Sequence, residues 1–175
     1  MTATSAMRFE ERATHLTSPL LERAGLSHLF GTRHFPGERA PDNPAAPCAT
    51  AEAARVAAAA GLDGHEAAFL KQVHGADVVR ADKGGFLGTG DALLADRPTV
   101  PLAIFTADCL AVTLWDSIAH VLVVAHVGWR GTARGAARAA VRAAVDAGAS
   151  ARQLHAAIAP SIGPCCYEVD EPVMR

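Results

Sequence analysis

The segment Thr106–Gly131, TADCLAVTLWDSIAHVLVVAHVGWRG, decides the fold of this chain. It holds two apolar runs, Ala111–Trp115 and Ala119–Val127, and the second is almost unbroken, which is typical of a strand buried on both faces. A glycine turn follows, and the Ala-rich stretch Thr132–Ala147 predicts a helix that ends at Gly148. This alternation predicts an α/β or α+β fold, with a mixed sheet flanked by helices.

The flanking sequence adds elements on both sides of this segment. Further strands are expected at Leu26–Thr32, Ala67–Val73, Asp77–Arg80, Leu102–Thr106 and Leu154–Ala159. A helix is expected from Ala51 to Ala60, with Thr50 as its N-cap and Gly61 at its end. The glycine-rich stretch Asp82–Gly90 is expected to be a flexible loop. No repeat or linker interrupts the pattern, so we expect residues 1–175 to form a single domain.

The composition indicates a globular protein. Half of the 175 residues are hydrophobic and the formal net charge is −2, which argues against a nucleic-acid-binding surface. No apolar run approaches the ~20 residues that a membrane-spanning helix needs. The N-terminus shows no apolar stretch of a secretory signal, and the four cysteines show no disulfide spacing. We therefore expect a cytoplasmic protein with reduced thiols, which contacts neither membrane nor nucleic acid.

Three residues suited to chemistry fall at predicted strand ends: His74 in KQVHG, Cys109 and His126. Open α/β sheets build their sites at such edges. Two imidazoles and one thiolate suit Zn²⁺, with the fourth position left for water or substrate. A second interpretation is a metal-free pair in which a histidine generates the Cys109 thiolate. A third is a buried apolar cysteine beside histidines that make ordinary turn contacts.

The motif VGWRG, Val127–Gly131, predicts an anion pocket. A strand ends, a glycine turn follows and a helix begins, so backbone N–H groups and the Arg130 guanidinium could hold phosphate or a carboxylate. Alternatively the glycines serve the turn and Arg130 is a surface charge. The sequence has no Walker motif and no GxGxxG, so binding of a nucleoside triphosphate or a dinucleotide is unsupported.

Two aspartates have two interpretations each. Asp108 could orient a histidine or bond a substrate, and it could equally stabilise a turn. Asp91, in GDALLAD, carries the same ambiguity. The helical spacing of Arg134, Arg138 and Arg142 indicates a solvated basic face.

Four motifs, in this order, resemble the YfiH/laccase-domain family: KQVHG, TADCLAV, AHVGWRG and APSIGPCCYEV. The resemblance runs from about Phe30 to the C-terminus. The family was once labelled a multicopper polyphenol oxidase and has since been described as zinc-dependent purine nucleoside enzymes. The resemblance implies a single α/β domain of the kind found in certain bacterial toxin cysteine hydrolases. It also implies phosphorolysis of adenosine, inosine and methylthioadenosine, and deamination of adenosine.

The resemblance assigns roles to individual residues. His74, Cys109 and His126 fall on the family's metal and catalytic centre, with zinc as the cofactor and copper possible at the same site. Arg130 would stay near that centre. Arg33, in FGTRHF, takes the place of the family's STR motif and would face the substrate. The implied partners are a nucleoside and phosphate, and the oligomeric state stays open.

The sequence departs from the family pattern at three places. Val127 replaces the usual alanine of HAGWRG, and His34–Gly37 replaces a Gly-Gly stretch after STR. The family carries several dozen further residues after YEV, so we expect the C-terminal part to be missing here.

Three other functions compete with the nucleoside enzyme. A laccase-like oxidase would need several coppers, and none of the eight histidines forms a His-x-His pair. A cysteine-dependent amidase could edit peptidoglycan with the same Cys109–His pair. A non-catalytic fragment could act as a binding module.

Overall fold

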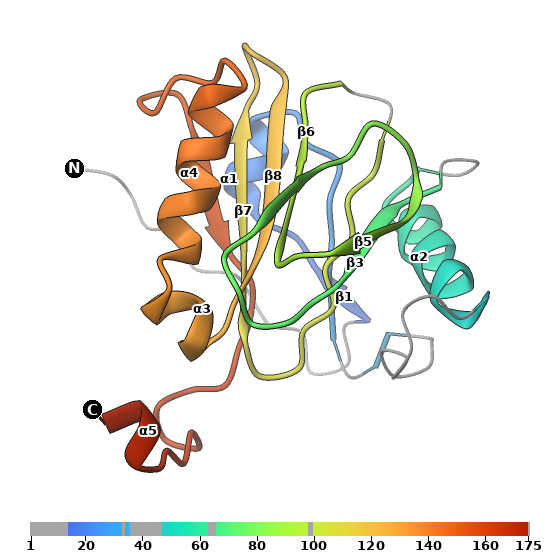
Figure 1. The fold of residues 1–175 in the computed structure, drawn as a ribbon. Helices are drawn as coiled ribbons and strands as arrows, with labels where there is room; N and C mark the ends of the chain where they lie inside the picture. The colour runs from blue at the N-terminus through green and yellow to red at the C-terminus, as the bar shows by residue number, and fades with distance from the viewer. Residues whose placement is uncertain (1–13, 33, 36–46, 63–65, 98–99, 175) are drawn as a thin grey trace.

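A mixed five-stranded sheet forms the centre of the molecule, in the order β4-β6-β8-β7-β9 (Figure 1). The computed structural model describes residues 14–32, 34–35, 47–62, 66–97 and 100–174. The strands are β1 (His15–Leu16), β2 (Phe30–Gly31), β3 (Ala68–Lys71), β4 (Val78–Arg80), β5 (Gly85–Thr89), β6 (Ala92–Ala95), β7 (Leu110–Asp116), β8 (Val121–Val127) and β9 (His155–Ile158). The helices are α1 (Pro19–Arg23), α2 (Pro47–Ala59), α3 (Trp129–Ala133), α4 (Ala136–Asp146) and α5 (Glu171–Met174). Among the described residues, no helix is long and apolar enough to cross a membrane.

The strand β8 is the middle strand of this sheet, as its unbroken apolar sequence predicts. It pairs antiparallel with β6 on one side and with β7 on the other. Its alternate side chains Val121, Val123 and Ala125 are buried in one core cluster with alanines of α4. Those alanines recur every four residues, at 136, 140 and 144, so the helix lays one smooth face on the sheet.

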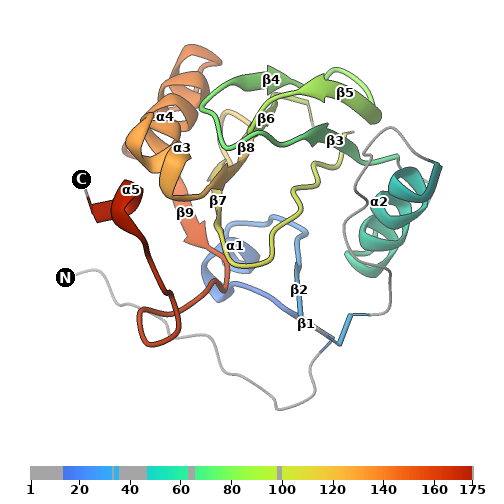
Figure 2. The ribbon, with the colours of Figure 1, turned by 60° about the horizontal axis from the view of Figure 1, so that its bottom comes forward.

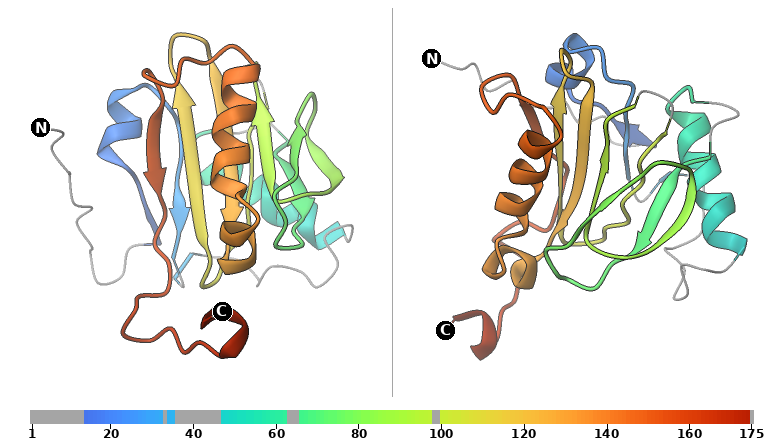
Figure 3. Two further views of the ribbon diagram at one scale, coloured as in Figure 1. Left: turned by 60° about the vertical axis from the view of Figure 1, so that its left-hand side comes forward. Right: turned by 45° about the horizontal axis from the view of Figure 1, so that its top comes forward.

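Helices lie on both sides of the sheet, which confirms the predicted α/β fold with a flanked mixed sheet. Figure 2 and Figure 3 show α4 against one face, with α1 and α2 on the opposite side. On that opposite side a cavity of about 530 Å³ is lined by apolar residues such as Trp115 and Leu122. The lining residues include none of His74, Cys109 and His126, so this cavity is separate from the candidate site.

The predicted single helix Thr132–Ala147 is wrong, because the structure divides it. α3 begins earlier, at Trp129, and ends at Ala133, and α4 starts at Ala136. Gly135 between them has φ +79°, a left-handed conformation that stops a right-handed helix and that glycine adopts without steric cost.

One loop prediction and one strand prediction are also wrong. The expected loop Asp82–Gly90 contains β5, which pairs parallel with β3. Conversely, the expected strand Leu102–Thr106 makes only a bridge from Leu102 to Ala68. The side chain of Gln72 replaces strand pairing farther along: it donates to the Phe105 carbonyl at 2.7 Å and accepts from the Phe105 N–H at 2.9 Å.

The elements α1 and β6 were not predicted, and only Phe30–Gly31 of the expected strand Leu26–Thr32 is a strand.

The buried carboxylate of Asp116, the last residue of β7, lies at the end of the sheet far from α3. Its Oδ1 accepts the N–H of Ile118 at 2.9 Å and of Ala119 at 3.0 Å, and its Oδ2 accepts that of Ser150 at 2.9 Å. The hydrogen bonds from Ala119 and Ser150 hold the pKa of Asp116 below its usual value. Asp116 therefore fixes both the β7–β8 turn and the segment that leads to β9.

We expect Asp116→Asn to lower the free energy of unfolding at pH 7 by roughly 1–3 kcal/mol, because hydrogen bonds to a charged acceptor contribute about that much. Since the pKa is depressed in the folded state, this stabilisation is present above the unfolded pKa of ~3.9 and is lost as the pH falls below it. Urea denaturation of both proteins at pH 7 and near pH 3 measures the effect. If the difference in unfolding free energy between wild type and Asp116→Asn were the same at both pH values, the prediction would be wrong.

Candidate metal centre

The candidate site lies at one end of the five-stranded sheet. Ala111 of β7 pairs with His126 of β8, and Cys109 directly precedes β7, so Cys109 and His126 lie at the same end of this strand pair. At the same end Ala92 begins β6 opposite Ala125, which places Asp91 there too. The pairing of β6, β7 and β8 thus brings together side chains that are far apart in sequence.

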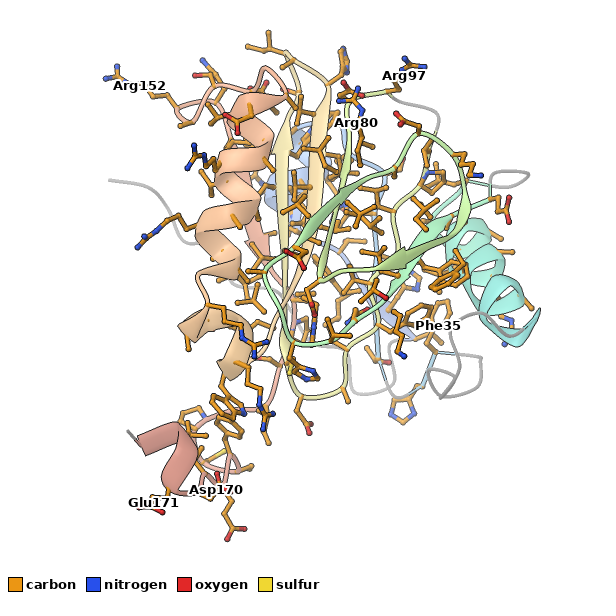
Figure 4. The ribbon with its side chains drawn as sticks, in the orientation of Figure 1. Phe35, Arg80, Arg97, Arg152, Asp170 and Glu171 are labelled. Atoms are coloured by element: carbon orange, nitrogen blue, oxygen red, sulfur yellow. The ribbon has the colours of Figure 1, made fainter. Side chains whose placement is uncertain are left out.

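His74 reaches the same end from the loop between β3 and β4. Val78 of β4 pairs parallel with Ala92, so this loop lies beside the start of β6. The C-terminal segment with α5, which carries Asp170 and Glu171, also leaves the sheet at this end, whereas Arg80, Arg97 and Arg152 lie at the opposite end (Figure 4).

The structure brings the three predicted ligands together. The ligand atoms of His74, Cys109 and His126 all lie within 4.8 Å of one another. The two imidazole rings meet edge to face, with centroids 4.7 Å apart. His126 is buried, and the other two side chains are partly exposed. Two nitrogens and one sulfur converging in this way fit a tetrahedral ion that keeps one position open toward solvent.

His74 has a backbone conformation that is uncommon outside glycine. Its φ is +58°, which costs roughly 1–3 kcal/mol unless its surroundings compensate. The His74 N–H donates to Asp91 Oδ1 at 2.8 Å, and its carbonyl accepts from Arg134 Nη1 at 2.9 Å. The second bond corrects the sequence interpretation of Arg134 as merely part of a solvated helix face.

Asp91 lies behind the candidate ligands and is only 1% exposed. Its Oδ1 accepts a hydrogen bond from His126 Nδ1 at 2.9 Å, and its Oδ2 accepts the Gly75 N–H at 2.6 Å. Burial alone would raise the pKa of Asp91, but the bonds from His126 and from the backbone N–H groups of residues 73–75 outweigh it and lower that pKa. Asp91, not Asp108, therefore holds the histidine.

Two glycines of the motifs leave room for the site. A Cβ added at Gly128 would lie 2.7 Å from Cys109 Sγ and 3.1 Å from His74 Cδ2. A Cβ added at Gly75 would lie 3.0 Å from Asp91 Oδ2. Glycine is therefore needed at position 75 of QVHG and position 128 of VGWRG because side chains of the site lie too close for a Cβ atom.

The electrostatic surroundings favour a cation next to the thiol. Burial raises the pKa of Cys109, and the nearby carboxylates of Asp108 and Asp91 raise it further. Without a cation the thiol thus stays protonated at pH 7, which weakens the metal-free thiolate interpretation. Burial and then the neighbouring His126 lower the pKa of His74, which keeps its imidazole neutral, as a metal ligand must be.

Of the three predicted substrate-binding residues, the structure describes Arg130 and Asp108, and both are exposed. Arg130 is exposed, and its guanidinium stacks 4.3 Å from the centroid of the Trp129 ring. It is close enough to contribute to the lowered pKa of His74. Asp108 is exposed, and its carbonyl accepts the Ile162 N–H at 3.1 Å. Arg33 lies outside the described residues.

The sequence of residues 37–175 matches the family model described as multi-copper polyphenol oxidoreductase laccase. The chain belongs to this family. Within this laccase-like YfiH family, it is 41% identical over 165 residues to a purine nucleoside phosphorylase of Deinococcus radiodurans, a match that covers 89% of the chain and 65% of that protein. It is 38% identical over 85 residues to adenosine deaminase RL5 from an unknown prokaryotic organism, covering 49% of the chain and 32% of that protein.

Solved structures of the family share the fold. The crystal structure of the hypothetical protein YfiH from Bacillus licheniformis superposes with a TM-score of 0.65 at 31% identity, covering 73% of the chain and 52% of that protein. YlmD from Geobacillus stearothermophilus gives the same TM-score and identity, covering 72% and 51%. The chain spans between about half and two thirds of the length of the first relatives that it matches, such as 65% and 53% of two of them.

Proposed function

We propose that this chain carries the zinc centre of a purine nucleoside enzyme, which phosphorolyses adenosine, inosine and methylthioadenosine and deaminates adenosine. The observation that carries the proposal is the convergence of His74, Cys109 and His126 within 4.8 Å. The names of the relatives, purine nucleoside phosphorylase and adenosine deaminase, supply the substrate class.

The residues around this centre would have different roles in catalysis and substrate binding. Zinc held by the three ligands would supply a Lewis acid that activates water or polarises a substrate oxygen. Arg130 provides a fixed positive charge at the rim, which suits phosphate, and its stacking on Trp129 limits the movement of the guanidinium. Asp108, exposed beside Cys109, is our candidate for a contact with the substrate.

The alternatives fit the site less well. A cysteine amidase needs a Cys109 thiolate, and the raised pKa of this thiol opposes one. A laccase needs several copper ions, whereas the described residues contain one group of three possible metal ligands. Copper could still bind at those ligands, because Cu²⁺ exceeds Zn²⁺ in the usual affinity order. The cytoplasmic location and the lack of contact with nucleic acid stay predictions.

Product analysis of adenosine incubated with the zinc-loaded protein tests the proposal. We expect adenine to appear only when phosphate is added, and inosine to appear without phosphate. Chromatography of the mixtures at successive times measures both products. The proposal fails if neither product forms while the protein is folded and holds zinc.

A further inference from the structure

We propose that Asp91 is a positioning residue of the metal centre, whose one carboxylate sets the orientation of two of the three ligands, His74 and His126. The inference rests on the proposed function only in taking these residues as metal ligands. Sequence interpretation left Asp91 open between a site and a turn.

Asp91 fixes which nitrogen of His126 is free. An ionised carboxylate can only accept hydrogen bonds, so the 2.9 Å contact between Asp91 Oδ1 and His126 Nδ1 requires the proton on Nδ1. A neutral imidazole carries one N–H, and Nε2 is then left with its lone pair for a metal. Both side chains are buried, at 1% and 4% exposure, so water does not compete for this bond.

Asp91 also fixes the backbone of His74. Three consecutive N–H groups, of Val73, His74 and Gly75, donate to its two carboxylate oxygens at 2.6–3.3 Å. These three N–H groups bind the same carboxylate, and their hydrogen bonds stabilise the left-handed conformation of His74. The same carboxylate thereby holds one ligand through its ring and the other through its main chain.

The strand pairing keeps Asp91 itself in place. The His126 N–H donates to the Asp91 carbonyl at 2.7 Å, so the backbone of Asp91 is tied to the ligand that its side chain orients. Because Asp91 is fixed in this way, it holds His74 and His126 in place before a metal binds. Loss of a residue that orients metal ligands typically lowers metal affinity 10–100-fold.

The test compares Asp91→Asn with the matched control Asp116→Asn. Both aspartates are 1% exposed and accept backbone N–H groups at opposite ends of the sheet. An asparagine at 91 offers one oxygen, so either His126 and His74 or Gly75 loses its acceptor. We expect Asp91→Asn to bind Zn²⁺ about 10–100-fold more weakly in a chelator competition and to alter the absorption spectrum of bound Co²⁺. Asp116→Asn should lose stability and keep both metal properties.

Equal zinc affinity and an unchanged cobalt spectrum in folded Asp91→Asn would overturn the inference. Should that variant not fold, nitrogen-15 NMR of the zinc-loaded wild-type protein decides instead. We expect the metal on Nε2 of His126 and the proton on Nδ1, and metal on Nδ1 would overturn the inference. A wild-type protein that binds neither ion would overturn it as well. Zinc binding without nucleoside turnover would refute only the proposed function.

Discussion

Replacing Cys109 with alanine is expected to abolish stoichiometric zinc binding and nucleoside turnover together. Cys109 supplies the only sulfur in the cluster with His74 and His126, and two histidines alone leave the ion with half of a tetrahedral shell. Losing a ligand should weaken binding by more than the 10–100-fold that loss of an outer partner costs. Metal analysis after gel filtration and the adenosine assay measure the two effects.

A cysteine outside the cluster provides the control for this experiment. Cys166 is exposed, and its Sγ contacts that of Cys165 at 3.0 Å. We expect Cys166→Ala to retain zinc and turnover, which would show that the loss does not arise from removing any thiol. Full activity in Cys109→Ala would reject the zinc nucleoside enzyme. Loss of activity with zinc retained would instead favour a nucleophilic cysteine.

Three strands of the sheet, β7, β8 and β9, could be predicted because their signal is local, whereas β6 was not predicted. The apolar runs of β7, β8 and β9 have few other stable arrangements than a buried sheet, and the structure places all three side by side. The sequence indicates His74, Cys109 and His126 as site residues because they fall at predicted strand ends, where open α/β sheets build their sites. Strand pairing brings Cys109 close to His126, and the hydrogen bonds of the His74 loop to Asp91 bring the third ligand within 4.8 Å.

The roles of Asp91 and Arg134 could not be predicted, because each depends on a partner far away in sequence. Asp91 is 35 residues from His126, and Arg134 is 60 residues from the carbonyl of His74 that it contacts. The one signal in the sequence is that Asp91 directly precedes the apolar residues 92–95 of GDALLAD, because a carboxylate that is buried beside such a run needs partners. The break between α3 and α4 was missed because a helical pattern of arginines continues across Gly135.

Replacing Gly128 with alanine is expected to damage the metal centre while leaving the fold in place. Gly128 has φ −77° and ψ 178°, an extended conformation that alanine adopts freely, so the backbone is not strained. The added methyl group would lie 2.7 Å from Cys109 Sγ and 3.1 Å from His74 Cδ2, and two of the three ligands must move apart. We expect zinc affinity to fall by at least the ~10–100-fold of a lost outer partner. Overpacking should cost about 1–3 kcal/mol of stability.

Gly31→Ala is the matched control, because its added Cβ would make only ordinary contacts, at 3.7 Å from Phe35. Zinc competition and urea denaturation on both variants separate the effect on the centre from the effect on the fold. Wild-type zinc affinity in Gly128→Ala would mean that the ligands do not need their present positions. The glycine of VGWRG would then serve the turn into α3, as the simpler interpretation of the sequence holds. Weak zinc binding in a folded Gly128→Ala would instead show that this glycine is needed to make room for the side chains of Cys109 and His74.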